Sequence, residues 1–418
     1  MSRAVIVGAG PAGALLGLLL ARWGVEVALL ERQADFHREF RGELLMPSGL
    51  GVFREVGLDR PFAAVPQRPL ERLEAFRGAR RLFEVDVRAA LAPGGAPHAV
   101  SQPALLEMLV AEASRLPTFR FERGAAVQGL IVEGDRVAGV RAALGEGEEE
   151  FRGDLVIGCD GRFSLLRTRS GLHEERAPQS FDVIWCKVSA PPGLPPGTGR
   201  LYLGHGHFAV AFPSYDGRLQ IGWIIDKGSF GDLKRRGVGA WLEDLEEHVS
   251  PDFAAHLRGC RGEAAHPFLL SVLSDRLERW TRPGLLLLGD AAHPMSPVGG
   301  QGLNMALRDA VVAANHLGPA LTAGKGVDEA AVAVQEERLK ETRSIQERQA
   351  RVPRVIFAGG WRTRLLIDTL APLLARVGLA QRFLRSNVRA FAFGEAEVRY
   401  VPPPGRQGMA AGLGFEPR

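Results

Sequence analysis

The chain has 418 residues, of which 46% are hydrophobic and 24% charged, a composition typical of a soluble globular protein with more than one domain. Its net charge is +4 and no dense Lys/Arg run with interleaved aromatic residues occurs, which argues against nucleic-acid binding. Cys159, Cys186 and Cys260 are far apart and the ten histidines form no HExxH pattern, so we expect neither a disulfide framework nor a metal site, and a reducing cytoplasm is favoured.

The N-terminal segment predicts a strand–turn–helix–strand unit. AVIV (4–7) is typical of a short strand, GAGPAG of a turn, ALLGLLLARWG (14–24) of a helix, and VEVALLE of a second strand that ends at Glu31. The uncharged stretch after Arg3 also resembles a secretory signal peptide, but the periodicity favours the βαβ unit of a nucleotide-binding domain.

The next region alternates between helical and strand-like patterns. We expect helices at 49–58 and 101–116 and strands at 70–76, 80–87, 119–124, 126–134, 136–144 and 154–161. Residues 178–267 differ, because short aromatic strands (181–188, 206–214, 219–225) and proline loops indicate an antiparallel sheet with one helix at 238–249. A buried strand followed by a helix returns from residue 284, and a long charged helix covers 331–352.

These patterns predict an α/β fold. A discontinuous Rossmann-like domain is expected at 1–75, 98–177 and 268–350, with an inserted, mainly antiparallel substrate-binding sheet at 76–97 and 178–267. Residues 351–400 are expected to form a helical C-terminal region and 401–418 a flexible tail.

Three glycines carry the first chemical signal. Gly8, Gly10 and Gly13 form GxGxxG between the first strand and the first helix, where they permit a tight turn, close approach of the backbone to a pyrophosphate, and close helix–strand packing. Glu31 ends the second strand and is placed to accept hydrogen bonds from an adenosine ribose, while its charge argues against a 2′-phosphate in this site.

Two further stretches follow apolar strands: GCDGRFSLLR (158–167) and LLLLGDAAHPMSPVGGQGLN (285–304). Each alone is compatible with an ordinary turn. In this order and at these separations, the three motifs resemble the flavoprotein aromatic hydroxylases, the single-component FAD monooxygenases related to p-hydroxybenzoate hydroxylase. The resemblance covers residues 1 to about 350.

The resemblance implies a noncovalent FAD site. Asp290 would hydrogen-bond the ribityl chain, the Gly299–Gly302 turn would face the N1–C2=O edge of the flavin, Leu303 and Asn304 would contact the ring, and Pro297 would flank the substrate. Asp160 would touch the pyrophosphate indirectly, Arg41 would reach the FAD unless it is a solvated surface residue, and a structural role is favoured for His293. The complete expected cofactor-binding set is Gly8, Gly10, Ala12, Gly13, Glu31, Arg32, Arg41, Gln102, Val127, Asp160, Asp290, Pro297, Gly300, Gly302, Leu303 and Asn304.

The resemblance also implies the reaction. NAD(P)H would bind transiently, because no second GxGxxG module occurs, and reduced flavin with O2 would form a C4a-hydroperoxide that hydroxylates an aromatic or otherwise electron-rich, hydrophobic small molecule. That substrate is expected against alternating positions of the middle sheet, either 208, 210 and 212 or 219, 221 and 223. No residue stands out as a catalytic base among Tyr202, His205, His207 and Tyr215. The expected pocket residues are Pro297, His207, Phe212, Tyr215 and Trp223.

Other interpretations stay open. A geranylgeranyl-type FAD reductase shares the fold, a flavin halogenase is disfavoured because no WxWxIP segment occurs, and a non-enzymatic prenyl-protein escort is disfavoured by the intact flavin motifs. Residues 351–389 are rich in Arg and in apolar runs, which fits either packing on the substrate domain, the favoured alternative, or peripheral contact with a membrane. The oligomeric state is not indicated.

Overall fold

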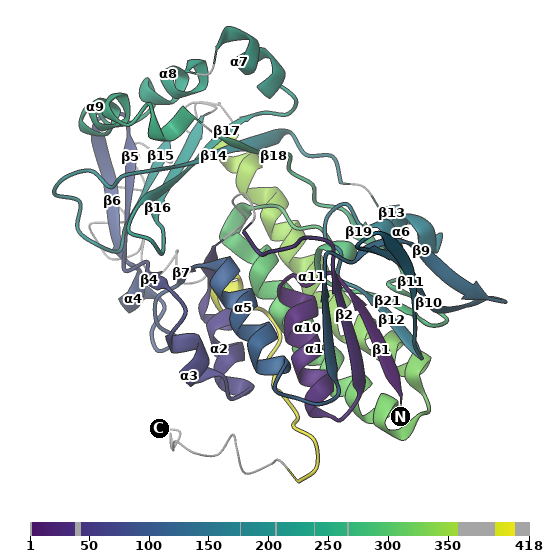
Figure 1. Cartoon of the computed structure of the whole chain (residues 1–418). Coiled ribbons are helices and arrows are strands. Elements are labelled where there is room, and N and C mark those ends of the chain that lie inside the picture. Colours follow the sequence, from purple (N-terminus) through teal and green to yellow (C-terminus); the bar gives the residue numbers. More distant parts are fainter. Residues whose placement is uncertain are drawn as a thin grey trace.

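The computed structural model describes residues 2–37, 43–175, 177–204, 207–237, 239–265, 267–357 and 389–405. These residues contain two large β-sheets, one of six strands and one of seven (Figure 1). The predicted α/β fold, with a discontinuous Rossmann-like part and an inserted sheet, is confirmed.

The six-stranded sheet has the order β20-β21-β12-β1-β2-β8. Its strands are β1 (Arg3–Val7), β2 (Glu26–Glu31), β8 (Phe119–Arg123), β12 (Leu155–Gly158), β20 (Thr281–Arg282) and β21 (Leu285–Leu287). Every neighbouring pair is parallel except β20 with β21. The carboxyl ends of the parallel strands therefore meet at one edge, which brings Gly8, Glu31, Asp160 and Asp290 to the same side of the sheet.

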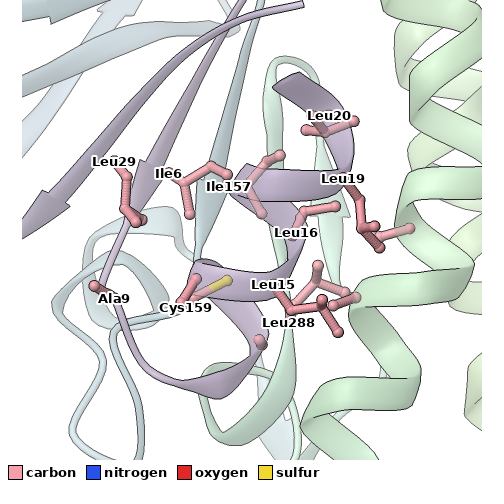
Figure 2. Packing of buried hydrophobic residues seen from close by; sticks show 14 of the residues in the cluster. Ile6, Ala9, Leu15, Leu16, Leu19, Leu20, Leu29, Ile157, Cys159 and Leu288 are labelled. Carbon is pink, nitrogen blue, oxygen red and sulfur yellow. The ribbon is translucent and has the colours of Figure 1, made fainter. Parts of the chain in front are cut away.

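Helices pack on this sheet from both ends of the sequence. They are α1 (Pro11–Arg22), α5 (Gln102–Ala113), α10 (Gln301–Ala323) and α11 (Val327–Phe357), and α1 contacts both α5 and α10. Every residue of β1 from Ala4 to Val7 is buried, as expected for a parallel strand that is covered on both faces. Leu15, Leu16 and Leu19 of α1 lie in the same core as residues of the strands (Figure 2). The helices predicted at 14–24, 101–116 and 331–352 are thus present.

A smaller antiparallel sheet joins the same core. It consists of β9 (Ala126–Glu133), β10 (Arg136–Leu144) and β11 (Gly147–Arg152), and the short helix α6 (Leu165–Ser170) contacts β9. Val137, Val140 and Phe151 of this sheet are buried in the core that contains α1. The sequence did not predict β11, because its run of glutamates hides the single inward-facing Phe151.

The seven-stranded sheet has the order β18-β14-β17-β16-β15-β5-β6. Its strands are β5 (Arg72–Arg77), β6 (Arg80–Asp86), β14 (Phe181–Val188), β15 (Thr198–Leu203), β16 (Phe208–Pro213), β17 (Leu219–Asp226) and β18 (Phe268–Leu270). Only β5 and β15 are parallel. The expected domain boundary between residues 75 and 76 falls inside β5. The expected boundary after residue 267 places β18 in a different domain from the strand with which it pairs. Strand pairing therefore assigns residues 72–75 and 268–270 to the seven-stranded sheet.

Three helices cover one face of the seven-stranded sheet (Figure 1). They are α7 (Phe230–Arg236), α8 (Ala240–Glu246) and α9 (Pro251–Gly259). Only α8 was predicted. Trp241, Phe253 and Leu257 from these helices form one core with Ile221 and Trp223 of β17. These helices do not cover the opposite face of the sheet.

Short elements connect the two sheets. They are β3 (Leu44–Leu45), β4 (Gln67–Pro69), β7 (His98–Val100), α2 (Pro47–Glu55), α3 (Asp59–Ala63), α4 (Val87–Ala90), β13 (Glu174–Glu175) and β19 (Arg276–Leu277), with single 3-10 turns at Glu263–Ala265, Gly289–Ala291 and Val298–Gly300. The strands β3, β7 and β4 form a three-stranded sheet beside α2.

The C-terminal region is described only in part. Residues 358–388 lie outside the described stretches, and so does most of the 351–389 region for which membrane contact was an alternative. Residues 389–405 return to the body of the protein, where Phe391 packs in a small core with Met295 and Met305. In the described stretches, no helix combines the length and the apolar character needed to cross a bilayer.

Candidate functional site

The turn after β1 has the geometry that the glycine motif predicts. A Cβ added to Gly8 would lie 2.4 Å from the carbonyl oxygen of Cys159, and one added to Gly13 would lie 2.0 Å from the carbonyl oxygen of Gly8. A Cβ on Gly10, in contrast, would meet no described atom within 4 Å. Gly8 and Gly13 are therefore required by the fold, whereas Gly10 leaves open space at the N-terminus of α1. Free N–H groups beside open space fit the pyrophosphate of a dinucleotide.

Glu31 braces this turn from the neighbouring strand. Its carboxylate is buried and accepts hydrogen bonds from the N–H of Ala9 and of Gln33, both at 3.0 Å. The turn and the end of β2 are thus held together before any ligand is considered. The contact of Glu31 with a ribose stays a prediction, and Arg32, expected beside it, is exposed.

The loop after β12 is held by Asp160. Its carboxylate accepts a hydrogen bond from the Ser164 hydroxyl at 2.5 Å and from the N–H of Leu166 at 3.1 Å, and burial raises its pKa. Ser164 in turn caps α6 by accepting the N–H of Arg167 at 2.9 Å. Asp160 therefore fixes the shape of its loop, and its indirect contact with a pyrophosphate stays a prediction.

Asp290, after β21, faces this loop. Its Oδ2 lies 3.3 Å from Nε of Arg162, and Arg167 donates to the backbone carbonyls of Asp290 and Ala291 at 3.3 and 3.0 Å. Nη1 of Arg162 is buried and has no hydrogen-bond partner among the described residues. An aspartate and an incompletely bonded guanidinium at the expected dinucleotide site suit a ligand that carries both hydroxyl and phosphate groups. The sequence reasoning missed Arg162, although it lies within the D-G-R-F segment.

The loop before α10, residues 297–300 and here called the glycine loop, lies next to Asp290. Gly299 and Gly300 have φ values of 74° and 62°, which only glycine adopts readily, and α10 begins immediately afterwards. A Cβ on Gly302 would lie 3.8 Å from Oδ1 of Asp290. This long helix therefore directs its positive N-terminal end to the region beside Asp290, as expected for a site that stabilises negative charge.

The side chain of Asn304 joins two parts of the chain that lie far apart in the sequence. Its side chain is fully buried, accepts the N–H of Met46 at 2.9 Å, and donates to the carbonyls of Leu44 and Gly300 at 3.1 and 2.7 Å. These backbone groups use both ends of the side-chain amide, and the contact of Asn304 with the ring stays a prediction. Asn304 fastens residues 44–46 to the glycine loop. Leu303 is likewise buried, in the main core.

The remaining expected cofactor residues are spread around the same edge. Ala12 is buried in α1, close enough that a Cβ on Gly289 would lie 3.5 Å from it. Gln102 begins α5 and is half-buried, and Val127 lies half-buried in β9 against the main core. Arg41 lies outside the described residues.

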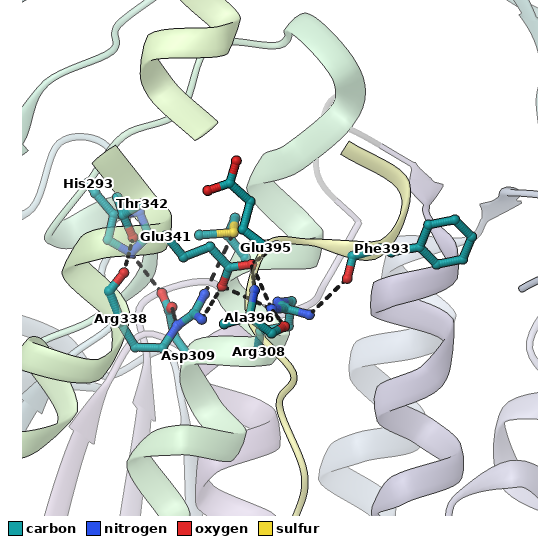
Figure 3. Close-up of polar contacts among 10 residues, drawn as sticks. His293, Arg308, Asp309, Arg338, Glu341, Thr342, Phe393, Glu395 and Ala396 are labelled. Carbon is teal, nitrogen blue, oxygen red and sulfur yellow. Dashed lines mark hydrogen bonds and ion pairs between the residues drawn. The ribbon is translucent and has the colours of Figure 1, made fainter. Parts of the chain in front are cut away.

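A buried network of charged residues supports the segment between Asp290 and the glycine loop (Figure 3). His293 Nε2 lies 2.7 Å from Asp309, which also accepts from Arg338 at 2.7 Å. Arg338 pairs with Glu341, and Glu341 accepts from Arg308 at 2.7 Å. Burial alone would raise the pKa of Asp309, but His293 and Arg338 hold it at about 2. This geometry agrees with a structural role for His293.

The network also fixes the C-terminal segment. Arg308 donates to the carbonyl oxygens of Phe393 and Ala396 at 3.4 and 2.6 Å, and Glu341 accepts the N–H of Glu395 at 2.8 Å (Figure 3). The side chain of Gln301 donates to the Phe391 carbonyl at 2.9 Å. The start of α10 is therefore held between the body of the protein and residues 389–396.

The face of the seven-stranded sheet where the substrate was expected is formed by alternate residues of its strands. Strand alternation puts Phe208, Val210 and Phe212 on the face away from α7–α9, and all three are partly exposed. Val298, the neighbour of Pro297 in the glycine loop, packs against a buried cluster that includes Phe181 and Val183 of β14, and Trp185 and Ile224 on this face pack against the same cluster. The glycine loop and this face therefore lie against each other, which keeps Pro297 and Phe212 as candidates for substrate contact.

Two expected pocket residues lie on the other side of the sheet. Trp223 is buried with the helices, together with Leu219 and Ile221. The ring of His207 lies 5.7 Å from that of Trp223 and 3.8 Å from that of His248, and burial followed by the neighbouring imidazole lowers its pKa. Both assignments are corrected, because alternation along a strand defines two faces without telling which one the helices cover.

A polar cluster missed by the sequence reasoning joins the two sheets. Glu43 accepts from Lys187 Nζ at 2.7 Å and from the Ser214 hydroxyl at 2.9 Å. The Lys187 ammonium lies 4.6 Å from the ring centre of Tyr215 and 3.8 Å from a carboxylate oxygen of Asp216. Burial raises the pKa of Glu43, and the contacts with Lys187 and Ser214 oppose that rise. Tyr215, an expected pocket residue, thus lies beside a charged pair.

Comparison with known proteins gives consistent results. A family model described as an FAD binding domain matches residues 1–349. The chain is 31% identical to 6-methylpretetramide 4-monooxygenase of Streptomyces rimosus over 399 residues, which are 94% of this chain and 93% of the relative. PqsL of Pseudomonas aeruginosa, in complex with 2-aminobenzoylacetate, superimposes with a TM-score of 0.76 at 22% identity, covering 88% of this chain and 100% of PqsL. The flavin-dependent brominase Bmp2 gives 0.70 at 18% identity, covering 93% and 98%. At these identities the two structures establish the fold alone.

Proposed function

Because the chain belongs to the FAD-binding-domain family, we propose that it hydroxylates a hydrophobic aromatic molecule bound between the glycine loop and the open face of the seven-stranded sheet. It is an FAD-dependent oxidoreductase of the monooxygenase class that uses NAD(P)H and O2. The observation that carries the proposed location is the packing of Val298, in the glycine loop, against the buried cluster that contains Phe181 and Val183 of the sheet.

The described residues fit FAD. The N-terminus of α1 beside Gly10 would hold the pyrophosphate, and Glu31 the adenosine ribose. Asp290 and Arg162 would bind the ribityl chain and phosphate, and the N-terminus of α10 would face the flavin edge that becomes negative on reduction. Bound FAD supplies the redox chemistry, in which NAD(P)H provides two electrons and one oxygen atom of O2 is transferred to the substrate.

The residues of the chain contribute binding, orientation and exclusion of water. Phe208, Val210 and Phe212 provide an apolar and aromatic surface, which favours a hydrophobic ring. The hydrogen bonds of the Asn304 side chain tie residues 44–46 to the glycine loop, and they keep the backbone that would face the flavin rigid. Rigid placement matters because a bound ring must lie within reach of the reacting atom while water stays out.

The proposal is tested by following NADH and NADPH oxidation with a panel of hydroxylated aromatic compounds under ¹⁸O2. We expect slow oxidation alone, faster oxidation with a substrate, and one ¹⁸O atom in the product. Substrate reduction without oxygen incorporation would indicate a geranylgeranyl-type reductase, and halide-dependent product formation a halogenase. Protein that purifies without flavin and does not bind added FAD would support the escort alternative.

A further inference from the structure

The face of the seven-stranded sheet away from α7–α9 carries a buried polar side chain, that of Gln220, to which the proposed function gives no role. Gln220 is only 5% exposed, and its side-chain nitrogen has no hydrogen-bond partner among the described residues. A buried amide that lacks a partner costs about 1–3 kcal/mol, so proteins seldom keep one unless something else bonds to it.

Strand alternation shows where this amide lies. Leu219 and Ile221, the neighbours of Gln220 in β17, belong to the core beneath α7–α9. The side chain of Gln220 is therefore on the opposite face, the one that meets the glycine loop. Phe212 is its register partner on β16 and Lys187 its register partner on β14.

Gln220 lies between two contacts that join this face to the flavin-binding part. On one side, Lys187 bonds Glu43, next to the segment that Asn304 fastens to the glycine loop. On the other side, Val298 packs against the buried cluster that contains Phe181 and Val183, together with Trp185 and Ile224 of the same face. Gln220 therefore belongs to the face that is held directly opposite the glycine loop, where the substrate ring is proposed to bind.

The surroundings of Gln220 define the chemistry of its ligand. Phe212 offers an aromatic wall on one side, and Lys187 is directly opposite on the other, with the Cβ atoms of paired residues about 4.5–5.5 Å apart. Lys187 is held in place by Glu43 and packs on the Tyr215 ring. An amide N–H beside an anchored ammonium favours an oxygen acceptor that carries partial or full negative charge.

We propose that Gln220 is a specificity-determining residue that donates a hydrogen bond to a ring oxygen of the substrate, a phenol or its keto form, with Lys187 beside that oxygen. The inference rests on the proposed function in that it places an aromatic substrate on this face. Aromatic molecules without an oxygen at this end leave the amide unbonded and bind more weakly. An electron-releasing oxygen held there also fixes which edge of the ring faces the flavin.

The test uses oxidised, FAD-loaded protein and three probes of similar size: 1-naphthol, 1-tetralone and 1-methylnaphthalene. Binding is followed through the visible absorption of the flavin, without NAD(P)H. We expect wild-type protein to bind the two oxygen-containing probes about tenfold more tightly than 1-methylnaphthalene. Gln220→Met, which keeps the length of the side chain, should abolish this preference. Gln220→Glu should shift it from the ketone to the phenol, since only the phenol can donate a hydrogen bond.

The matched control is Gln128→Met, the same exchange at an exposed position of β9, which should leave the preference unchanged. Equal or undetectable binding of the three probes by wild-type protein would overturn the proposal, and so would an unchanged preference in Gln220→Met. Loss of FAD from Gln220→Met would show that the amide binds the cofactor instead. Because these measurements involve no turnover, they stand or fall separately from the oxygen-incorporation experiment.

Discussion

Replacement of Arg338 by methionine tests whether the buried charge network stabilises the protein. Arg338 is fully buried and bonds Asp309 and Glu341 at once. Removing one partner of a buried ion pair costs about 3–5 kcal/mol, because the other charge stays buried. Here Asp309 keeps His293 and Glu341 keeps Arg308, so we expect the lower end, about 3 kcal/mol.

The assay is urea unfolding at neutral pH with saturating FAD, followed by far-UV circular dichroism and flavin fluorescence. A loss of about 3 kcal/mol corresponds to a midpoint that is lower by roughly 1 M urea, if the slope is about 3 kcal/mol per molar. The matched control is Arg348→Met on the same helix, because that arginine pairs with Glu395 in an ion pair whose side chains are 40% and 28% exposed. Exposed pairs contribute about 0–1 kcal/mol, so its midpoint should barely move.

If both variants lost less than about 1 kcal/mol, the buried charges would not contribute net stability, and the reasoning from desolvation would be wrong. A native-like midpoint in Arg338→Met together with loss of flavin would mean that the network only orients the loop between Asp290 and Gly300.

Three further predictions concern acid, the glycine turn and the flavin contact. The pKa of Asp309 is held at about 2, below its ordinary 3.8, so the stability that its ionised form contributes is complete above about pH 4 and is lost as the pH falls through about 2. The difference in urea midpoint between wild type and Arg338→Met should therefore narrow between about pH 4 and about pH 2. A constant difference would contradict this assignment. Gly10→Ala should fold normally but bind FAD at least about tenfold more weakly, because its Cβ would enter the open space where the pyrophosphate is expected. Gly13→Ala should yield little folded protein, because its Cβ would lie 2.0 Å from a carbonyl oxygen. Circular dichroism and flavin content distinguish the two variants, and equal behaviour would refute the distinction. Asp290→Ala should keep the fold and lose roughly tenfold in FAD affinity, whereas Asp290→Asn should lose less. Fluorescence titration of the apoprotein with FAD measures both affinities. Normal FAD binding by Asp290→Ala would mean that the carboxylate serves only as a partner of Arg162.

The elements predicted best from the sequence are those whose signal is local. The first strand, the glycine turn, α1 and the strand ending at Glu31 follow from periodicity and from glycine geometry within about 30 residues, and all are present. The expected helix 331–352 likewise corresponds to α11, because its pattern of charged and apolar residues is continuous. Such elements need no knowledge of distant partners.

The parts that were missed depend on partners far along the chain. Arg162 and Asp290 are 128 residues apart, and Glu43 and Lys187 are 144 apart, so neither pair leaves a local pattern. The side-chain amide of Asn304 bonds backbone groups around residue 45, a contact that was not predicted because only the folded chain brings these groups near. Trp223 was misplaced because α7 and α9, which cover its face of the sheet, were not predicted.

The order of the six-stranded sheet has a consequence for synthesis on the ribosome. β12 pairs with β1 on one edge and with β21 on the other, and the whole segment from Phe181 to Leu270 lies between β12 and β21 in the sequence. At about 5–20 residues per second, the second edge of β12 waits on the order of ten seconds for its partner to be made. Its apolar residues LVIG present an unpaired edge during that time, the kind of surface on which nascent chains associate wrongly. Slower initiation, which keeps neighbouring nascent chains further apart, should therefore increase the yield of correctly folded protein more than added FAD does.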